Sequence, residues 1–410
     1  MTPIKNARVG RANLSKSLPL AASLAALALT LLPLAAPAGK PGDKLAGKRP
    51  DYWIGYTVHR TDLQGYYPNR VTRRAFVVKG DGSATAELAP ELVSKPHQCT
   101  QFAGWSPDGR QAILDQVWES PENGAWEDKN GRWRFSAEHW LEDLILVDLE
   151  TKKTTNLTAV ERVSFYNAGL HFWPENKFSF SALIDGQMRP YQMDRDGKNK
   201  KPVSAGAGFI YGVSPSPDGK RICYHRDYRL YLADADGSNA QAVKDDNPFH
   251  FIPLWSPTGE WVAYLSGQHY NCHPHLVRPD GTGLRKLGDR GGYRGVIQPI
   301  DKGGTGHSER SDIHTWSPDG KWLYYTAKVG EAVELMRASP DGKSEQLTRS
   351  KAGVGNYLPQ VSPDSQWVVF GSTSTGVRQL HVARADGSEV YQLTKVEAGW
   401  GAFYPYWRPK

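Results

Sequence analysis

One phrase recurs along the chain and constrains the fold more than any other feature: Trp-Ser-Pro-Asp-Gly followed by a charged residue. Within it, Pro fixes φ and Gly accepts a positive φ, which is the chemistry of a tight turn. The residues after the turn alternate between apolar and polar, as a strand does. The phrase therefore predicts a strand, a hairpin turn and a second strand. Copies of the phrase occur at residues 105–110, 216–220, 255–260 and 316–321, and degenerate copies occur at 173–177 and 361–364.

The spacing of the copies predicts a repeat of four strands. The Trp position or its substitute recurs at 105, 173, 215, 255, 316, 361 and 407, so the copies lie 40 to 68 residues apart. A second turn, Asp-Gly, recurs between the expected third and fourth strands, as at Asp386-Gly387. Four antiparallel strands in a repeat of this length are typical of a propeller blade, which buries its faces only against neighbouring blades.

The two ends of the chain complete each other. Residues 403–407 form a first strand with no second strand after it, whereas the chain opens at residues 52–58 with a second strand that lacks a first. One blade shared by both ends leaves no unpaired sheet edge there and makes seven blades. We therefore predict an all-β chain, a seven-bladed β-propeller over residues 51–410 with four-stranded blades. Six blades is the rival count, because the unit at Trp173 has lost Ser-Pro-Asp-Gly.

The N-terminal residues have the pattern of an export signal. Four basic residues and no acid precede an apolar run over residues 18–34, and Ala36-Pro37-Ala38 supplies a cleavage site. We expect residues 1–38 to be a signal peptide, residues 39–50 to be a flexible tether, and the mature protein to be periplasmic or secreted, without a membrane span after cleavage. An uncleaved membrane anchor is the alternative.

The charge of the chain does not indicate nucleic acid as a partner. The formal net charge is +7, and removing the four basic residues of the leader leaves +3. No other block of Lys and Arg is present. The three cysteines, Cys99, Cys223 and Cys272, are too few for a disulfide scaffold, although one disulfide is possible in an oxidising compartment.

The repeat phrase, together with endings such as Asp236-Gly237-Ser238, resembles the TolB-type propeller repeat over nearly all of residues 51–410. The resemblance implies the fold. It also implies an exported propeller that binds a protein or glycan partner, because the repeat serves periplasmic partner binding as well as peptidases and polysaccharide lyases. We expect a monomer.

A second, more distant resemblance is to the oligogalacturonate lyases, which hold Mn²⁺ with three His and a Gln. His314, two residues before the Trp of its repeat, and His225, at the end of a second strand, match positions of that family. The family's Gln-x-x-His-x-His run is replaced here by Gly353, Asn356 and Leu358, so three of its four metal ligands are missing. The resemblance implies the alternative function, a lyase acting on acidic oligosaccharides that contain uronates. Whether a divalent metal (Mn²⁺ or Ca²⁺) takes part is left open at this point.

Long insertions all fall in loops of one face, where second strands join third strands and where blades join. These segments are residues 59–74, 115–142, 267–274 and 288–313. Because loops on one face of a rigid scaffold commonly carry binding and catalysis, we assign function there. For a lyase, the candidate bases are His225 and His314, the candidate acids are Tyr293 and Tyr357, and Arg310 or Arg226 neutralises the sugar carboxylate. His314 and His250 are candidate metal ligands. Further candidate ligand-binding residues are Arg226, His250, His269, His273, His275, His307 and Asp312.

The insertion at residues 115–142 is rich in aromatic and acidic residues. Its Trp residues, at 118, 126, 133 and 140, either stack on sugar rings or pack the loop onto the blade. Its carboxylates at Glu119, Glu122 and Glu127 are candidates for an acid and a base, although no spacing fixes them as a pair across a sugar ring.

Overall fold

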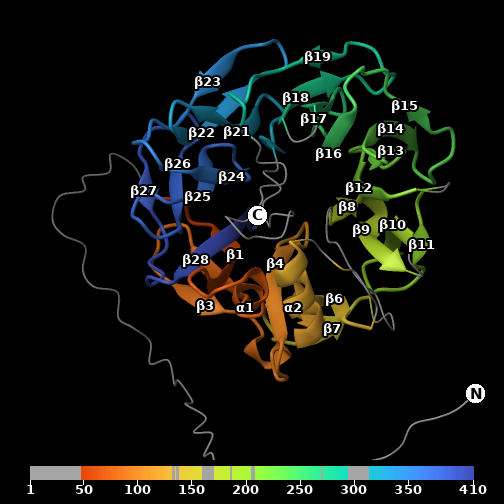
Figure 1. Cartoon of the computed structure of the whole chain (residues 1–410). Coiled ribbons are helices and arrows are strands. Elements are labelled where there is room, and N and C mark those ends of the chain that lie inside the picture. Colours follow the sequence, from red (N-terminus) through yellow and green to blue (C-terminus); the bar gives the residue numbers. More distant parts are fainter. Residues whose placement is uncertain are drawn as a thin grey trace, which may run out of the picture. The chain divides into compact units, whose positions relative to one another are not determined.

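The C-terminal strand closes the ring, as the sequence predicts. In the computed structural model, β28 (Trp400–Trp407) pairs antiparallel with β1 (Trp53–Arg60), so the two ends of the propeller share one sheet. Seven sheets of four antiparallel strands each are arranged around one axis (Figure 1). The fold is a seven-bladed β-propeller, and the rival count of six is wrong.

The structure describes residues 48–131, 134, 138–158, 170–184, 187–204, 208–268, 271–293 and 314–410. All of them belong to one compact unit, Leu45–Lys410. In the described residues, no helix combines the length and the apolar character that a membrane crossing requires.

Blades 1 to 3 use both ends of the chain and carry the helices. Blade 1 consists of β28, β1, β2 (Arg74–Lys79) and β3 (Thr85–Glu87); blade 2 of β4 (Gln98–Trp105), β5 (Gln111–Glu119), β6 (Trp140–Asp148) and β7 (Thr154–Asn156); blade 3 of β8 (His171–Trp173), β9 (Lys177–Ile184), β10 (Gln187–Asp194) and β11 (Lys201–Pro202). The two α-helices are α1 (Tyr66–Arg70) and α2 (Pro121–Asn130), and short 3₁₀ turns are formed by Pro90–Leu92 and Pro174–Asn176.

Blades 4 to 7 follow one another along the chain. Blade 4 consists of β12 (Ile210–Pro215), β13 (Arg221–Arg226), β14 (Arg229–Asp234) and β15 (Gln241–Ala242); blade 5 of β16 (Phe249–Trp255), β17 (Val262–Gln268), β18 (Asn271–Val277) and β19 (Arg285–Lys286); blade 6 of β20 (Thr315–Trp316), β21 (Leu323–Val329), β22 (Ala332–Ala338) and β23 (Ser344–Gln346); blade 7 of β24 (Asn356–Val361), β25 (Trp367–Ser372), β26 (Gln379–Arg384) and β27 (Tyr391–Gln392).

The repeated Ser-Pro-Asp-Gly turn is held by its own side chains. The Ser106 hydroxyl donates to Asp108 Oδ1 at 2.6 Å and accepts the backbone N–H of Gln111 at 3.0 Å. Gly109 takes φ 64° and donates its N–H to the Ser106 carbonyl. The Ser106 hydrogen bond is the main reason that the pKa of Asp108 falls to about 2. The same Ser-to-Asp bond recurs in blades 4, 6 and 7, which explains why the phrase is repeated as a unit.

The repeated Trp joins one blade to the blade before it. Trp105, Trp255 and Trp316 are buried, each with 6% of its surface exposed. The indole N–H of Trp105 donates to the carbonyl of Tyr406 in blade 1, and that of Trp316 to the carbonyl of Leu254 in blade 5. Each neighbouring pair of blades also shares a cluster of buried apolar side chains, so the core is a ring of seven interfaces.

Two of the expected insertions are shorter than predicted. The segment 267–274 is mostly strand, since β17 and β18 stay paired as far as Gln268 and Asn271. The segment 115–142 begins within β5 and ends within β6, and α2 lies between those strands. The three cysteines are free thiols buried in the blades, so none of them forms the disulfide that the sequence allowed.

Candidate functional site on the loop-bearing face

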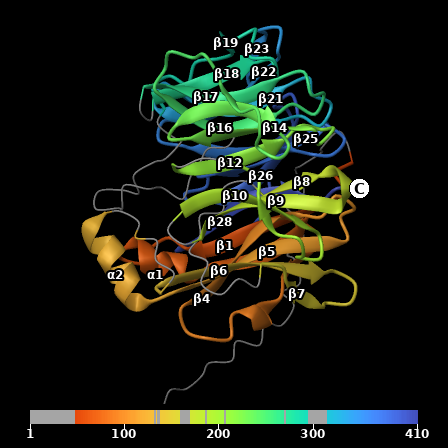
Figure 2. The same ribbon diagram turned by 90° about the vertical axis from the view of Figure 1, so that its right-hand side faces the viewer.

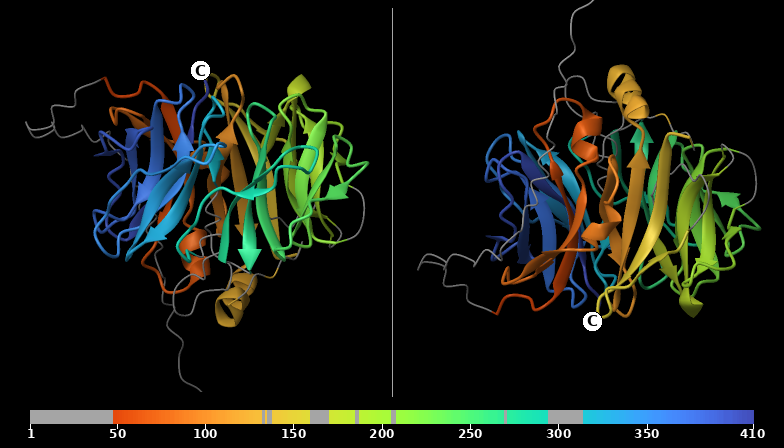
Figure 3. Two further views of the ribbon diagram at one scale, coloured as in Figure 1. Left: turned by 90° about the horizontal axis from the view of Figure 1, so that it is seen from above. Right: turned by 90° about the horizontal axis from the view of Figure 1, so that it is seen from below.

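The face that receives the connections between second and third strands, and those between blades, is here called the loop-bearing face. Both α1 and α2 lie on it, over blades 1 and 2, and Figures 2 and 3 show the two helices on the same side of the ring. The repeated Ser-Pro-Asp-Gly turns lie at the opposite ends of the strands. Among the described residues, both α-helices therefore lie on the face to which the sequence analysis assigns the function.

Three predicted site residues, His225, His250 and His314, lie on consecutive blades and are fully buried. Their exposed fractions are 0%, 1% and 0%. Burial lowers the pKa of His225 to about 3, and the nearby charge of His250 adds to the effect. Burial likewise lowers the pKa of His250 and of His314 to about 4. These imidazoles are therefore neutral at pH 7.

His250 holds a neighbouring turn in place. Its Nδ1 accepts the backbone N–H of Leu230 at 2.9 Å, so Nδ1 carries no proton and the ring proton is on Nε2, 3.5 Å from Asp245 Oδ2. The backbone N–H of His250 donates to the carbonyl of Tyr228 at 2.8 Å. Asp245 is fixed in turn by the hydroxyls of Tyr264 and Ser266 at 2.9 and 2.6 Å.

His273 and His275 lie in strand β18 rather than in a loop. The Nδ1 atom of His273 accepts the N–H of Arg290 at 3.1 Å, and that of His275 lies 2.9 Å from the carbonyl of His273. Burial lowers the pKa of both imidazoles. In the part of the chain that the structure describes, no three His, Cys, Asp or Glu side chains are grouped so that they could hold a metal ion. His250 and His314 therefore have no third ligand among those residues.

The other predicted residues are spread over several blades. Tyr293 follows blade 5 and lies under the guanidinium of Arg290, at 4.8 Å from its centre. Tyr357 is in blade 7 and lies 4.7 Å from the guanidinium of Arg378. Arg226 ends β13 and stacks on Tyr231 at 4.2 Å. The remaining predicted residues lie outside the described residues: His269, His307, Arg310, Asp312 and Trp133.

A group of aromatic residues at the loop-bearing ends of blades 4 and 5 is here called the aromatic platform: Tyr228, Phe249 and Phe251, whose rings are in contact, and Phe209, whose backbone is hydrogen-bonded to Asp227. The Tyr228 ring meets Phe249 edge-on at 5.3 Å and Phe251 edge-on at 5.5 Å. Phe249 and Phe251 are nearly parallel at 6.3 Å. Tyr228 and Phe209 are each 40% exposed, whereas Phe251 is buried. The platform therefore has a rigid base and two exposed rings.

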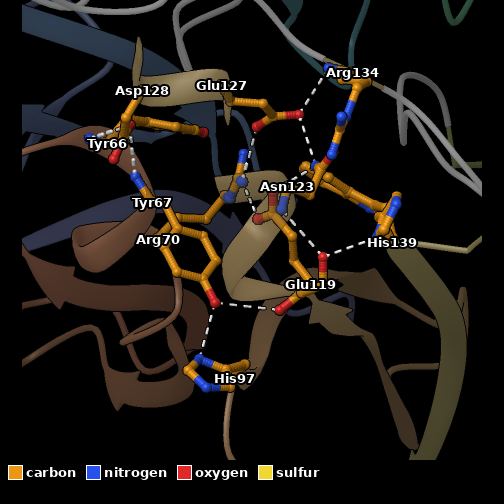
Figure 4. A network of polar contacts seen from close by, with 12 residues as sticks. Tyr66, Tyr67, Arg70, His97, Glu119, Asn123, Glu127, Asp128, Arg134 and His139 are labelled. Atoms are coloured by element: carbon orange, nitrogen blue, oxygen red, sulfur yellow. Dashed lines mark hydrogen bonds and ion pairs between the residues drawn. The ribbon is translucent and has the colours of Figure 1, made fainter. Parts of the chain in front are cut away.

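A buried ionic network joins α1 to α2, and the two helices are here called the α1–α2 cap (Figure 4). Arg70 of α1 forms ion pairs with Glu119 at the end of β5 and with Glu127 of α2, the latter at 3.0 Å. The amide nitrogen of Asn123 donates to both carboxylates, at 2.8 and 3.1 Å. Arg70, Glu119 and Glu127 are each 1% exposed or less. The network therefore fixes three elements from two blades to one another.

Aromatic rings and backbone groups surround the network. The Arg70 guanidinium lies 4.6 Å from the ring of Tyr66 and 4.3 Å from that of Trp140. The Tyr67 hydroxyl reaches His97 Nδ1 at 2.8 Å (Figure 4). Burial raises the pKa of Glu119 to about 7, although Arg70 opposes the shift. Glu119 and Glu127, considered from the sequence as an acid and a base, here have Arg70 and Asn123 as partners and no exposure to solvent.

Exposed large apolar side chains gather on the loop-bearing face. Among the described residues there are seven of them, and five lie at that end of the blades. The five on the loop-bearing face are Leu63, Leu141, Phe209, Tyr228 and Val329, and the two at the opposite face are Leu284 and Val390. Scattered apolar residues are normal on a surface, and these five lie on blades 1, 2, 4 and 6.

The sequence analysis missed Tyr228, Phe209, Phe249 and Arg70. A usable signal existed for Tyr228, because a two-residue connection between strands is normally Asn-Gly or a similar pair and here it is Asp227-Tyr228. No local signal marks Arg70, whose partners stand 49 and 57 residues further along the chain.

The fold defines the class of the protein, the seven-bladed β-propellers with four-stranded blades. No protein-family model matches the chain. The structural neighbours include both kinds of protein that the sequence resembles. A TolB from Acinetobacter baumannii matches 88% of this chain and 67% of its own with a TM-score of 0.49 and 16% identity. An oligogalacturonate lyase in complex with manganese matches 86% of this chain and 89% of its own with a TM-score of 0.52 and 14% identity. At these identities the likeness shows the fold alone.

Among curated sequences, an uncharacterised protein of Agrobacterium fabrum is 31% identical over 185 residues. The match covers 38% of this chain and 61% of that protein. The chain thus matches less than two thirds of the length of this relative.

Proposed function

We propose that this chain is an exported propeller that binds a partner with its loop-bearing face. The observation that carries the proposal is the one-sided distribution of the exposed large apolar side chains. The α1–α2 cap supports it, because burying Arg70, Glu119 and Glu127 costs desolvation energy and the four-stranded blades do not need the two helices. A rigid, partly apolar face is a suitable recognition surface, since little conformational entropy is lost when a partner binds.

The positions of the candidate bases do not support the lyase alternative. A general base must come within hydrogen-bonding distance of the proton that it removes. His225 and His314 are both fully buried. We therefore propose binding without catalysis as the function.

Blocking one face at a time tests the proposal. The native cysteines are buried, so a cysteine introduced at the surface can be labelled selectively with a large poly(ethylene glycol) maleimide. Leu141→Cys on the loop-bearing face and Leu284→Cys on the opposite face form a matched pair, at 37% and 38% exposure. The probes are cell-envelope proteins and a panel of oligogalacturonates, xylo-oligosaccharides and cello-oligosaccharides.

We expect the label at Leu141 to reduce binding and the label at Leu284 to leave it unchanged. Equal effects of the two labels, or no binding of any probe to the unlabelled protein, contradict the proposal. Export has a separate test, because N-terminal sequencing of the mature protein should start at Gly39. A mature protein that begins at Met1 and stays in the membrane fraction identifies an anchor instead.

A further inference from the structure

The connection between β13 and β14 contains residues that do not suit its shape. It is a two-residue hairpin loop, because Arg226 pairs with Arg229. Both loop residues have a positive φ, 49° at Asp227 and 64° at Tyr228. This conformation favours Asn and Gly, and a bulky residue is strained there. In the equivalent loop of blade 6, Gly330, with φ 60°, stands at the first of the two positions, which Asp227 occupies in blade 4. Because Tyr228 also has a positive φ, blade 4 carries a tyrosine at a conformational cost.

The surroundings of Tyr228 hold its ring in one orientation. Phe249 and Phe251 pack edge-on against the ring, and the His250 N–H fixes the Tyr228 carbonyl. The Asp227 N–H donates to the carbonyl of Phe209 at 3.0 Å. The Asp227 carboxylate accepts the Phe209 N–H at 2.9 Å. The backbones that carry the two exposed residues are thus hydrogen-bonded to each other, and the Tyr228 ring is held by its ring contacts before a ligand binds.

The two strand ends that flank the Asp227-Tyr228 turn carry groups that can bind hydroxyl groups. Arg226 is fixed by stacking on Tyr231, and Arg229 donates to the carbonyl of Asn247 at 2.7 Å. Asp227 supplies a carboxylate beside them. An edge with both donors and acceptors around exposed aromatic rings matches a sugar ring, which has apolar C–H faces and a rim of hydroxyl groups.

The small size of the platform argues for a sugar rather than for a protein. A stable protein interface buries about 800 Å² on each partner. Only two rings of the platform are 40% exposed, and the other exposed apolar residues of this face lie on blades 1, 2 and 6. Two rings match one or two sugar units and supply only a small part of a protein interface.

We propose that the aromatic platform is an oligosaccharide-binding site in which Tyr228 and Phe209 stack on pyranose rings and the Arg226, Asp227 and Arg229 edge binds their hydroxyl or carboxylate groups. This inference rests on the proposed function, because it names the ligand class and the position of the site on the loop-bearing face. The conformational cost at Tyr228 is then the consequence of presenting a ring to the ligand, as strain often is at functional sites.

The variant Tyr228→Asn separates binding from folding. Asn suits a positive φ, so we expect the stability of the variant to be equal to or greater than that of the wild type. Loss of one stacking ring should weaken binding of the oligosaccharide by about tenfold or more, measured by titration calorimetry against oligogalacturonates, xylo-oligosaccharides and cello-oligosaccharides. Phe209→Ala should act in the same direction. Val390→Ala, at an exposed position on the opposite face, is the control and should bind as the wild type does.

The inference is overturned if the wild type binds none of these oligosaccharides, or if Tyr228→Asn binds them unchanged. It is also overturned if the platform variants weaken binding of an envelope protein and of no oligosaccharide. In each of these cases the proposed function still stands if a label at Leu141 blocks a partner and a label at Leu284 does not. Equal effects of those two labels contradict the proposed function itself.

Discussion

Replacing Arg70 by Met should destabilise the propeller strongly, because it leaves two buried carboxylates without their cation. Glu119 and Glu127 are almost completely inaccessible to water, and Arg70 is paired with both. Removing one partner of a buried ion pair costs about 3–5 kcal/mol. We expect the lower part of that range, about 3 kcal/mol, because Asn123 continues to donate to both carboxylates and the backbone N–H of Arg134 to Glu127.

The destabilisation should depend on pH in a defined direction. Burial already raises the pKa of Glu119 to about 7, above its value in the unfolded chain, and the loss of Arg70 raises it further. A group with a raised folded-state pKa stabilises fully below its unfolded pKa, and that contribution is lost as pH rises through the folded value. The effect of Arg70→Met should therefore be larger at pH 8 than at pH 5, by at most about 1.4 kcal/mol, because the two proteins titrate differently only over the one pH unit between the wild-type pKa of about 7 and pH 8.

Urea unfolding followed by tryptophan fluorescence at pH 5 and pH 8 measures both effects. The triple variant Arg70→Met, Glu119→Gln, Glu127→Gln should recover most of the lost stability and remove the pH dependence. Arg60→Met is the matched control, because Arg60 forms an exposed ion pair with Asp62 at 2.7 Å in the same connection and should leave the unfolding midpoint unchanged. An Arg70→Met midpoint equal to that of the wild type at both pH values would show that the network does not hold the cap.

Two further substitutions, one truncation and one titration test the fold. Trp316→Ala should cost about 3–5 kcal/mol, because a large side chain between two blades is removed, and an unchanged melting temperature would contradict the blade assignment. Truncation before Gly401 removes most of the closing strand, so light scattering should detect aggregation through the exposed edges. Gly124→Ala should destabilise the cap although alanine favours helix, because its Cβ would lie 2.1 Å from the ring of Tyr67, and circular dichroism melts measure the sign. His225, His250 and His314 have folded-state pKa values lowered to about 3 to 4, so they contribute stability above pH 6.5 that is lost as pH falls toward 4. Acid titration of the unfolding midpoint should show this decline. A midpoint that does not change between pH 7 and pH 4 would contradict it.

The fold could be predicted from the sequence because its determinants are local and repeated. Each Ser-Pro-Asp-Gly turn is closed by hydrogen bonds among residues at most five positions apart, as between Ser106 and Gln111. Each repeated Trp stands at the same position relative to its Ser-Pro-Asp-Gly turn, so it marks the first strand of a blade. The number of repeats therefore predicts the number of blades. The lengths of the connections were less predictable, because β17 and β18 continue to pair as far as Asn271 and no residue pattern marks the end of such pairing.

The chemical state of the site residues could not be predicted, because it depends on groups far apart in the sequence. The role of His250, for example, is set by Leu230, 20 residues earlier, and by Asp245. Burial lowers the pKa of His250 and keeps the imidazole neutral although Asp245 opposes the shift, so a residue type typical of catalysis positions a turn here. The residue that the turn presents is Tyr228, at a φ of 64° that a tyrosine rarely adopts. Connecting two strands does not require a strained tyrosine or a buried histidine beneath it, and both lower the stability of the fold. Holding an exposed ring in one orientation for a ligand does require such support. The arrangement around Tyr228 therefore favours ligand binding over a purely structural role.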